Sequence, residues 1–305
     1  MAERVGFIGV GLMGHGMAKN LVEKGHALTI LGHRNRAPVE DLVGRGAKEA
    51  RSAAEVARES DIVFLCVTGS PEVEANVRGP NGLAAGAHEG LVVVDCSTAD
   101  PNSTMALAAE LRSLGVAYCD SPLGGTPAQA EAGQLSAMVG CDPEVWPRLE
   151  PVIKAWAARV IRVGGVGDGH KMKLLNNFLS MGYGALYAEA LALAQKVGIS
   201  PQTFDSVIRG SRMDCGFYQT FMKYVLERDR NAHQFALRNA HKDMRYVVNM
   251  GNAAGVANHV GAAVKNVYAT AEAIGRGEDY VPMLSDIVAE LNGVSLDPSA
   301  RKAAE

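Results

Sequence analysis

A short apolar segment that leads into a glycine-rich turn and then a helix restricts this chain more than any other feature. Residues 4–8 precede Gly9-Val10-Gly11-Leu12-Met13-Gly14, and residues 17–25 have a helical pattern closed by glycine. A second apolar run, residues 27–31, follows at the distance typical of a βαβ unit. Glycines at this spacing let backbone N–H groups approach a pyrophosphate at a helix N-terminus. Residues 9–14 are therefore predicted to bind a dinucleotide rather than to form an ordinary glycine-rich turn.

Further apolar runs recur through the first half of the chain at α/β spacing, at residues 61–67, 91–96, 116–120, 135–140 and 159–163. Helical patterns such as residues 52–59 and 103–114 lie between them. This alternation predicts a doubly wound, mostly parallel sheet of the Rossmann type. Ligands of such sheets bind beyond the carboxyl ends of the strands. The residues at those ends are Val67-Thr68-Gly69, Cys96-Ser97-Thr98 and Asp120-Ser121-Pro122-Leu123-Gly124-Gly125-Thr126. The last segment is either an anion-binding loop or a plain tight turn.

The second half of the chain shows only helical patterns. One very long helix is expected from about residue 168 to Gly198, and Ser200-Pro201 then starts another. Further helices are expected near residues 217–227, 237–251, 261–275 and 283–292. We therefore expect an α/β protein with a dinucleotide-binding domain at residues 1–164 and an all-helical domain at residues 165–305, which would bind substrate and mediate dimerisation. The long helix would join the two domains.

The end of the second predicted strand bears on the choice of dinucleotide. NAD sites usually carry an acidic residue there, for the ribose hydroxyls. This chain has Gly32-His33-Arg34-Asn35-Arg36 instead. Two guanidiniums can face a 2′-phosphate, so His33, Arg34 and Arg36 favour NADP, with NAD possible. The alternative is that these arginines belong to a solvated loop.

Composition excludes several classes of protein. The net charge of the 305 residues is -3, and no basic cluster suggests nucleic acid as a partner. No segment resembles a signal peptide or a membrane span, so the cytoplasm is the expected location. The five cysteines, Cys66, Cys96, Cys119, Cys141 and Cys215, form no CxxC pair. We expect reduced thiols and no metal site.

The start of the long helix carries polar residues that suggest chemistry. Lys173 and Asn177 are four residues apart and so share one helix face. A lysine in the first turns is mildly opposed by the helix dipole. The plain alternative is a solvated lysine near a helix end.

Four motifs in order make the chain resemble the β-hydroxyacid dehydrogenase family, over residues 4–293. They are Gly9-Val10-Gly11-Leu12-Met13-Gly14, Asp95-Cys96-Ser97-Thr98, Gly169-His170-Lys171-Met172-Lys173-Leu174-Leu175-Asn176-Asn177 and His241-Lys242-Asp243. That family includes 3-hydroxyisobutyrate dehydrogenase, tartronate semialdehyde reductase and sulfolactaldehyde reductase. The resemblance implies a Rossmann domain, a helical domain like that of 6-phosphogluconate dehydrogenase, and a homodimer or homotetramer.

The resemblance also implies roles for individual residues. Lys173 matches the catalytic lysine and Asn177 the asparagine that orients the substrate. Residues 9–14, Val67, Thr68 and Thr98 match positions that contact the cofactor, and Lys242 matches a lysine at the cofactor and substrate cleft. Lys173 would give a proton to the developing alkoxide during reduction and take it back during oxidation. The expected reaction interconverts a small anionic β-hydroxyacid and its semialdehyde.

One loop departs from the family pattern. The family usually has D-A-P-V-S-G-G, with the serine on the substrate carboxylate, where this chain has glycine at position 124. The sulfolactaldehyde reductase branch also has glycine there and a threonine two residues later, but it has arginine at the position of Gly125. Leu123, Gly124, Gly125 and Thr126 are therefore expected to contact the substrate, whose identity is left open.

Two other functions are compatible with the sequence. One is a reductase of imines or of other short carbonyls, although such relatives usually replace the lysine. The other is a non-catalytic, dinucleotide-binding assembly protein.

Overall fold

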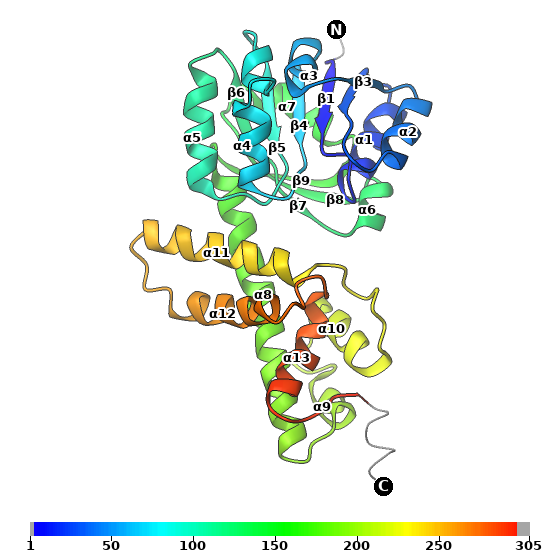
Figure 1. Ribbon diagram of the computed structural model, residues 1–305, viewed down its shortest axis with the longest axis vertical. Coiled ribbons are helices and arrows are strands. Elements are labelled where there is room, and N and C mark those ends of the chain that lie inside the picture. The colour runs from blue at the N-terminus through cyan, green and yellow to red at the C-terminus, as the bar shows by residue number, and fades with distance from the viewer. Residues whose placement is uncertain (1–2, 298–305) are drawn as a thin grey trace. The chain divides into compact units, whose positions relative to one another are not determined.

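The computed structural model describes residues 3–297. Contacts divide the chain into two compact units, Met1–Lys173 (unit 1) and Leu174–Glu305 (unit 2). The division falls inside one long helix, α8 (Asp168–Lys196), which is labelled in Figure 1. This helix begins and ends close to where the sequence predicts.

The described part of unit 1 contains a nine-stranded sheet in the order β3-β2-β1-β4-β5-β6-β8-β7, with β9 also paired to β8. The strands are β1 (Val5–Ile8), β2 (Leu28–Leu31), β3 (Lys48–Ala50), β4 (Ile62–Leu65), β5 (Val92–Asp95), β6 (Ala117–Asp120), β7 (Leu123–Gly124), β8 (Leu135–Gly140) and β9 (Ala157–Gly164). Strands β1 to β6 pair in parallel, whereas β8 runs antiparallel to β6 and β7. The expected doubly wound, mostly parallel sheet is confirmed.

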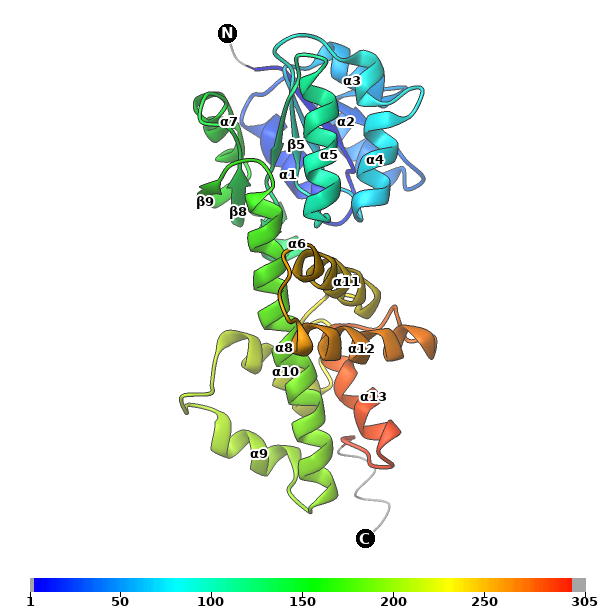
Figure 2. The ribbon, with the colours of Figure 1, turned by 90° about the vertical axis from the view of Figure 1, so that its left-hand side faces the viewer.

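Both faces of the sheet are buried, because alternate side chains of its strands enter different cores. Phe7, Phe64 and Val94 belong to one core, and Ile8, Leu65 and Val93 to the other. The helices of this unit are α1 (Gly14–Glu23), α2 (Ala37–Gly44), α3 (Ala53–Glu59), α4 (Ser70–Arg78), α5 (Pro101–Arg112), α6 (Pro127–Glu131) and α7 (Trp146–Ile153), with a 3₁₀ turn at Leu83–Gly86. Residues of α1, α2 and α7 join the first core and residues of α3, α4 and α5 the second. Figure 2 shows α7 and α5 on opposite sides of the strands.

Unit 2 is built from helices. After α8 come α9 (Pro201–Ile208), α10 (Gly216–Glu227), α11 (Leu237–Ala253), α12 (His259–Ala273) and α13 (Leu284–Leu291), with a 3₁₀ turn at Val281–Met283. Ser200 caps α9 as expected, since its Oγ accepts the Thr203 N–H at 3.0 Å. Tyr218, Phe221 and Tyr268 are among the large side chains of its core. Between residues 174 and 297, strand-like pairing is limited to one isolated bridge, Ala236 with Tyr280.

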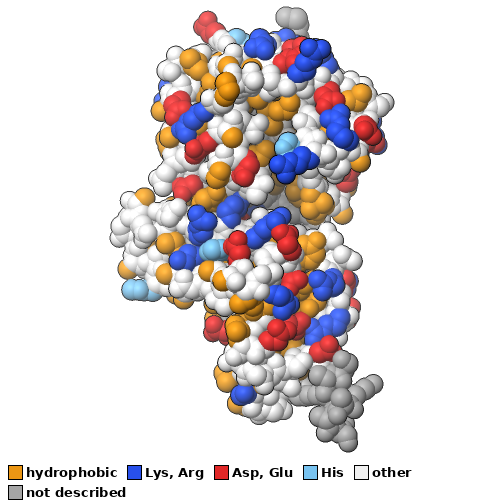
Figure 3. Space-filling model, in the orientation of Figure 1, with side chains coloured by type: hydrophobic (Ala, Val, Ile, Leu, Met, Phe, Trp, Pro, Cys, Tyr) orange, Lys and Arg blue, Asp and Glu red, His pale blue; other side chains and the backbone are white. Residues whose placement is uncertain are grey.

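Charges of both signs are interspersed on the face of each unit drawn in Figure 3. Among residues 3–297, none of the helices combines the length and the apolarity that crossing a membrane requires.

Candidate active site

The glycine-rich turn after β1 has the shape that a dinucleotide requires. Gly9 has φ +97°, and a Cβ there would collide with the Cys66 carbonyl oxygen. A Cβ on Gly14, the first residue of α1, would collide with the Gly9 carbonyl oxygen. In contrast, a Cβ on Gly11 would meet nothing within 4 Å. Two glycines thus close the turn, and the third leaves its backbone open to a ligand. The first turn of α1 has no acidic residue to oppose a phosphate, so these residues fit the pyrophosphate of a dinucleotide.

The ends of two neighbouring strands lie at the same edge of the sheet as this turn. Val67 and Thr68 follow β4, and Thr98 follows β5. Since β1, β4 and β5 are adjacent and parallel, their carboxyl ends meet at one edge. The two loops are also tied directly, because the Val67 N–H donates to Ser97 Oγ at 3.0 Å. The structure therefore brings together the predicted cofactor residues of these three segments.

The basic residues after β2 are exposed, and one of them, Arg36, already has a partner. The Arg36 guanidinium donates to both carboxylate oxygens of Glu49 in β3, at 2.7 and 2.8 Å. These hydrogen bonds hold the pKa of the Glu49 carboxyl below its ordinary value. The positive charge of Arg36 is therefore already balanced, whereas His33 and Arg34 lie beside it on the exposed segment.

A buried carboxylate anchors the start of α8. Asp120, the last residue of β6, is fully buried, and its two oxygens accept the N–H groups of Gly167 and His170 at 2.6 Å each. Burial raises the pKa of the Asp120 carboxyl. Because β6 ends at the carboxyl edge of the sheet, this contact places the first turn of α8, which leads to Lys173, at that edge.

The side chain of His170 extends the same buried cluster. Its Nδ1 lies 2.7 Å from the Thr104 hydroxyl, and its Nε2 lies 3.7 Å from Asp95 Oδ2. Tyr118 donates to that same Asp95 oxygen at 3.1 Å. The first turn of α8 is thus held through both its backbone and a side chain.

In unit 2, Asn177 and Lys242 meet at one further carboxylate. The Asn177 amide Nδ2 donates to Asp243 Oδ2 at 2.7 Å, and both residues are buried. Lys242 Nζ lies 3.3 Å from Asp243 Oδ1 and 5.5 Å from the centre of the Tyr246 ring. Lys173, four residues before Asn177 on α8, is partly exposed. Both predicted polar residues thus lie on the helix that the sequence indicated.

The loop after β6 is more structured than the sequence suggests. Leu123 and Gly124 form the short strand β7, paired with Ala137 and Ser136 of β8. Gly125 has φ +133°, a conformation that L side chains rarely adopt. Thr126 caps α6, and its N–H donates to Gln129 Oε1 at 2.9 Å while its hydroxyl accepts the Gln129 N–H at 3.3 Å.

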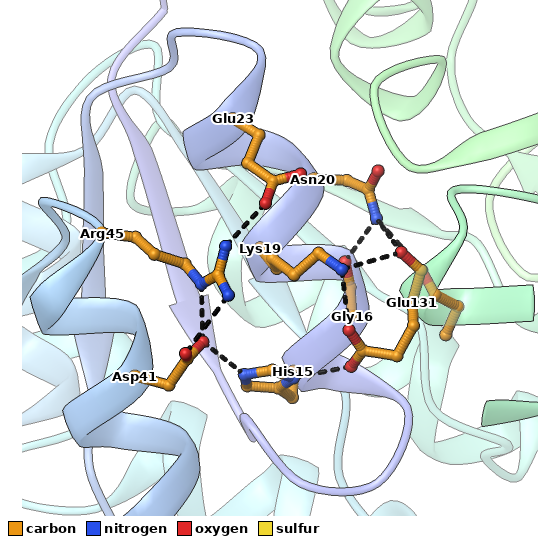
Figure 4. Close-up of polar contacts among 9 residues, drawn as sticks. His15, Gly16, Lys19, Asn20, Glu23, Asp41, Arg45 and Glu131 are labelled. Atoms are coloured by element: carbon orange, nitrogen blue, oxygen red, sulfur yellow. Dashed lines mark hydrogen bonds and ion pairs between the residues drawn. The ribbon is translucent and has the colours of Figure 1, made fainter. Parts of the chain in front are cut away.

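Helix α6, which follows this loop, is tied to α1 by the polar contacts drawn in Figure 4. Glu131 accepts from His15 Nδ1 at 2.6 Å and from Lys19 Nζ at 3.0 Å. The Asn20 amide donates to the Ala130 carbonyl oxygen at 3.1 Å, and a Cβ on Gly16 would lie 2.5 Å from the backbone of α6. The candidate substrate loop is therefore fixed to the helix that starts at the dinucleotide turn.

The sequence assigned no role to three of these carboxylates, Asp120, Glu131 and Asp243, although Asp120 and Asp243 lie in segments that it singled out. An acid at the end of a buried strand, as at Asp120, and an acid next to Lys242, as at Asp243, are sequence signals that could have found two of them. Glu131 lies 116 residues from His15, and we find no local signal for that pair.

Two protein-family models match this chain, and both describe NAD-binding parts of dehydrogenases. The family model for the NAD binding domain of 6-phosphogluconate dehydrogenase matches residues 4–165. The model for the NAD-binding region of NADP-dependent 3-hydroxyisobutyrate dehydrogenase matches residues 167–286.

Similar proteins cover nearly the whole chain. A 2-(hydroxymethyl)glutarate dehydrogenase of Eubacterium barkeri is 31% identical over 96% of this chain and 97% of its own length. A 3-sulfolactaldehyde reductase of Escherichia coli is 32% identical over 93% of this chain and 95% of its own. Among solved structures, a Mycobacterium tuberculosis 3-hydroxyisobutyrate dehydrogenase with L-serine superposes with a TM-score of 0.84 at 26% identity, covering 94% of this chain and 99% of the other.

Proposed function

The chain belongs to the β-hydroxyacid dehydrogenase family and is an NAD(P)-dependent oxidoreductase of the 3-hydroxyisobutyrate dehydrogenase type, and we propose that it interconverts a small anionic β-hydroxyacid and its semialdehyde. The observation that carries this proposal is the anchoring of the first turn of α8, three residues before Lys173, at the sheet edge where the dinucleotide turn lies. The two relatives are named for 2-(hydroxymethyl)glutarate and 3-sulfolactaldehyde, both small anions, which supports this substrate class.

We assign the proton transfer to Lys173. The nicotinamide, when bound, supplies or accepts the hydride. As an ammonium, Lys173 would stabilise the developing alkoxide oxygen and protonate it, and as a neutral amine it would take the hydroxyl proton in the reverse direction. Asn177 would orient the substrate, and Lys242 would contact the cofactor and the substrate. Residues 1–164 would form the dinucleotide-binding domain and residues 165–305 the helical domain.

Replacement of Lys173 tests this assignment. Lys173→Ala should lower turnover by about 10²- to 10⁴-fold, the usual range for a lost general acid or base, and leave NADPH binding nearly intact. Lys171→Ala is a matched control on the same helix, since Lys171 is exposed and paired with Asp168 at 2.9 Å. Wild-type rates in Lys173→Ala would show that the assignment is wrong.

We propose NADP as the preferred cofactor, with NAD possible, because Arg34 and Arg36 follow β2 where NAD sites usually carry an acid. Initial rates with NADPH and NADH at matched substrate concentration test this preference. Equal or better use of NADH would reverse it.

A second candidate, a reductase of the sulfolactaldehyde type, is favoured by Gly124 and Thr126 and by the Escherichia coli relative. A panel of carboxylate and sulfonate semialdehydes, assayed with both nicotinamides, separates the two. Turnover of the sulfonates alone would select the second candidate. The presence of Lys173 counts against an imine reductase, and the dehydrogenase relatives over the whole length count against a non-catalytic assembly protein.

We also propose that the protein is a homodimer or homotetramer located in the cytoplasm. Apolar side chains of α8 in unit 2 are exposed at helical spacing, namely Leu175, Leu179, Tyr183, Leu186 and Leu193. A second copy of this chain would cover such a row. All five cysteines are free, which supports a reducing compartment. Light scattering should give a multiple of 32.2 kDa, and Leu179→Lys with Leu186→Lys should reduce it to one chain.

A further inference from the structure

Ser136 occupies the space next to Gly124, the residue at which this chain departs from its family. Strands β7 and β8 are antiparallel, and Gly124 is directly opposite Ser136. Residues opposite each other in an antiparallel pair present their side chains on the same face of the sheet. A Cβ added to Gly124 would lie 2.5 Å from Ser136 Oγ and 3.9 Å from Ser136 Cβ. The hydroxyl of Ser136 therefore lies on the face, and close to the position, where a side chain at 124 would begin.

This hydroxyl is only weakly engaged within the protein. It donates to the Gly124 carbonyl oxygen at 3.3 Å. Hydrogen bonds between a hydroxyl and an oxygen are usually about 2.7 to 2.8 Å long, so this one is weak. The Ser136 side chain is also partly exposed. A hydroxyl hydrogen rotates freely about its C–O bond, so it can turn to a ligand at little cost.

The two polar groups of Thr126 are less available to an anion. The Thr126 N–H is engaged by Gln129 Oε1, and the Thr126 hydroxyl caps α6. The loop itself is fixed at one end by the β7–β8 pairing and at the other by α6, which is bonded to α1. Ser136 is thus a rigidly placed hydroxyl beyond the end of β6, at the sheet edge where ligands of this fold bind.

We propose that the Ser136 hydroxyl binds the anionic group of the substrate, a carboxylate or a sulfonate, from the strand opposite Gly124. The inference rests on the proposed function and identifies the residue that determines its specificity for anions. The hydroxyl donates one hydrogen bond to an anionic oxygen, and no covalent step is involved.

Three variants test the proposal. Ser136→Ala should raise KM for an anionic semialdehyde by roughly ten- to a hundredfold, as expected for loss of a hydrogen bond to a charged group. Its dissociation constant for NADPH should not change. The KM for an uncharged aldehyde of the same length should also stay the same. If the substitution instead loosened the whole loop, the KM for the uncharged aldehyde would rise as well.

The double variant Gly124→Ser/Ser136→Ala moves the hydroxyl across the strand pair. Since the Oγ that would crowd a Cβ at 124 is then absent, the double variant should recover most of the affinity lost in Ser136→Ala. Wild-type turnover is the reference for the proposed function and for the assignment of Ser136. If the wild type turns over no anionic semialdehyde or hydroxyacid, the proposed function is wrong. If it does and Ser136→Ala has the same KM for the anion, the assignment of Ser136 is wrong.

Discussion

The amide of Asn177 is held by the carboxylate of Asp243, which accepts its Nδ2 hydrogen at 2.7 Å in the core of unit 2. A carboxylate only accepts hydrogen bonds, so the atom that faces it must be the nitrogen. The amide orientation is thereby fixed, and the Asn177 oxygen points away from Asp243.

Asp243→Asn should impair the reaction without removing any group proposed to contact the substrate. An amide at 243 can pair with either end of Asn177, so that the orientation is no longer unique. We expect kcat/KM to fall about 10- to 100-fold, which corresponds to the ~1.5–3 kcal/mol of a charged hydrogen bond. Steady-state kinetics measure it. Asn176→Ala is the control, since Asn176 donates to Asn177 only at 3.3 Å and should have a much smaller effect.

Asp120→Ala should both destabilise unit 1 and lower kcat. It leaves the buried N–H groups of Gly167 and His170 without their acceptor, which costs on the order of 2–4 kcal/mol. Urea unfolding gives the stability, and NADPH titration should show cofactor binding largely retained. Asp168→Asn, in the same turn but with a partly exposed side chain, should cost less than about 1 kcal/mol. Equal effects of the two substitutions would contradict the anchoring role of Asp120.

Glu131→Gln should change how stability depends on pH. Burial acts to raise the pKa of Glu131, but hydrogen bonds from His15 and Lys19 outweigh it and lower the pKa below its ordinary value. A lowered native pKa contributes stability that is complete above the unfolded value and is lost as pH falls through the native one. The variant should therefore be less stable at neutral pH, by less than about 1 kcal/mol because the side chain is well solvated. This difference should vanish in acid.

Thermal midpoints measured between neutral and acidic pH test this expectation. Glu23→Gln is the matched control, since Glu23, at the end of α1, pairs with Arg45 at 2.6 Å on the exposed surface. A difference between wild type and Glu131→Gln that is constant over the whole pH range would rule out a contribution from the charge.

Arg34→Ala should raise KM for NADPH by about tenfold and leave KM for NADH unchanged, because only the former has a 2′-phosphate. Arg36→Ala should have a smaller effect, since Glu49 already holds that guanidinium. Glu49→Gln should then lower KM for NADPH by releasing Arg36. A uniform change for both nicotinamides in all three variants would argue against recognition of the phosphate.

Local patterns in the sequence predicted the fold and the family, and both predictions are confirmed. The glycines of residues 9–14 lie within one turn, and Lys173 and Asn177 lie within one helix, so periodicity and spacing suffice to find them. The helical second half was also recognised, including the Ser200 cap of α9. The catalytic and binding roles of these residues stay predictions.

The contacts that fix the site could not be predicted, because they join residues far apart in the sequence. His170 and Asp120 are separated by 50 positions, Asn177 and Asp243 by 66, and His15 and Glu131 by 116. Such pairs are set by tertiary packing, which hydrophobic periodicity does not report. Strand β7 was missed for a different reason: two residues are too few to show any alternation.

The positive φ of Gly125 limits how this protein can change its substrate by single mutations. An arginine at that position would enter a backbone conformation that costs an L residue about 1–2 kcal/mol, and its Cβ would meet Leu135 at 2.8 Å. Ser136 lies in strand β8 and has no positive φ, so position 136 imposes no such restriction. Evolution or protein engineering toward new anionic substrates should therefore proceed more readily through the strand that faces the loop than through the loop itself.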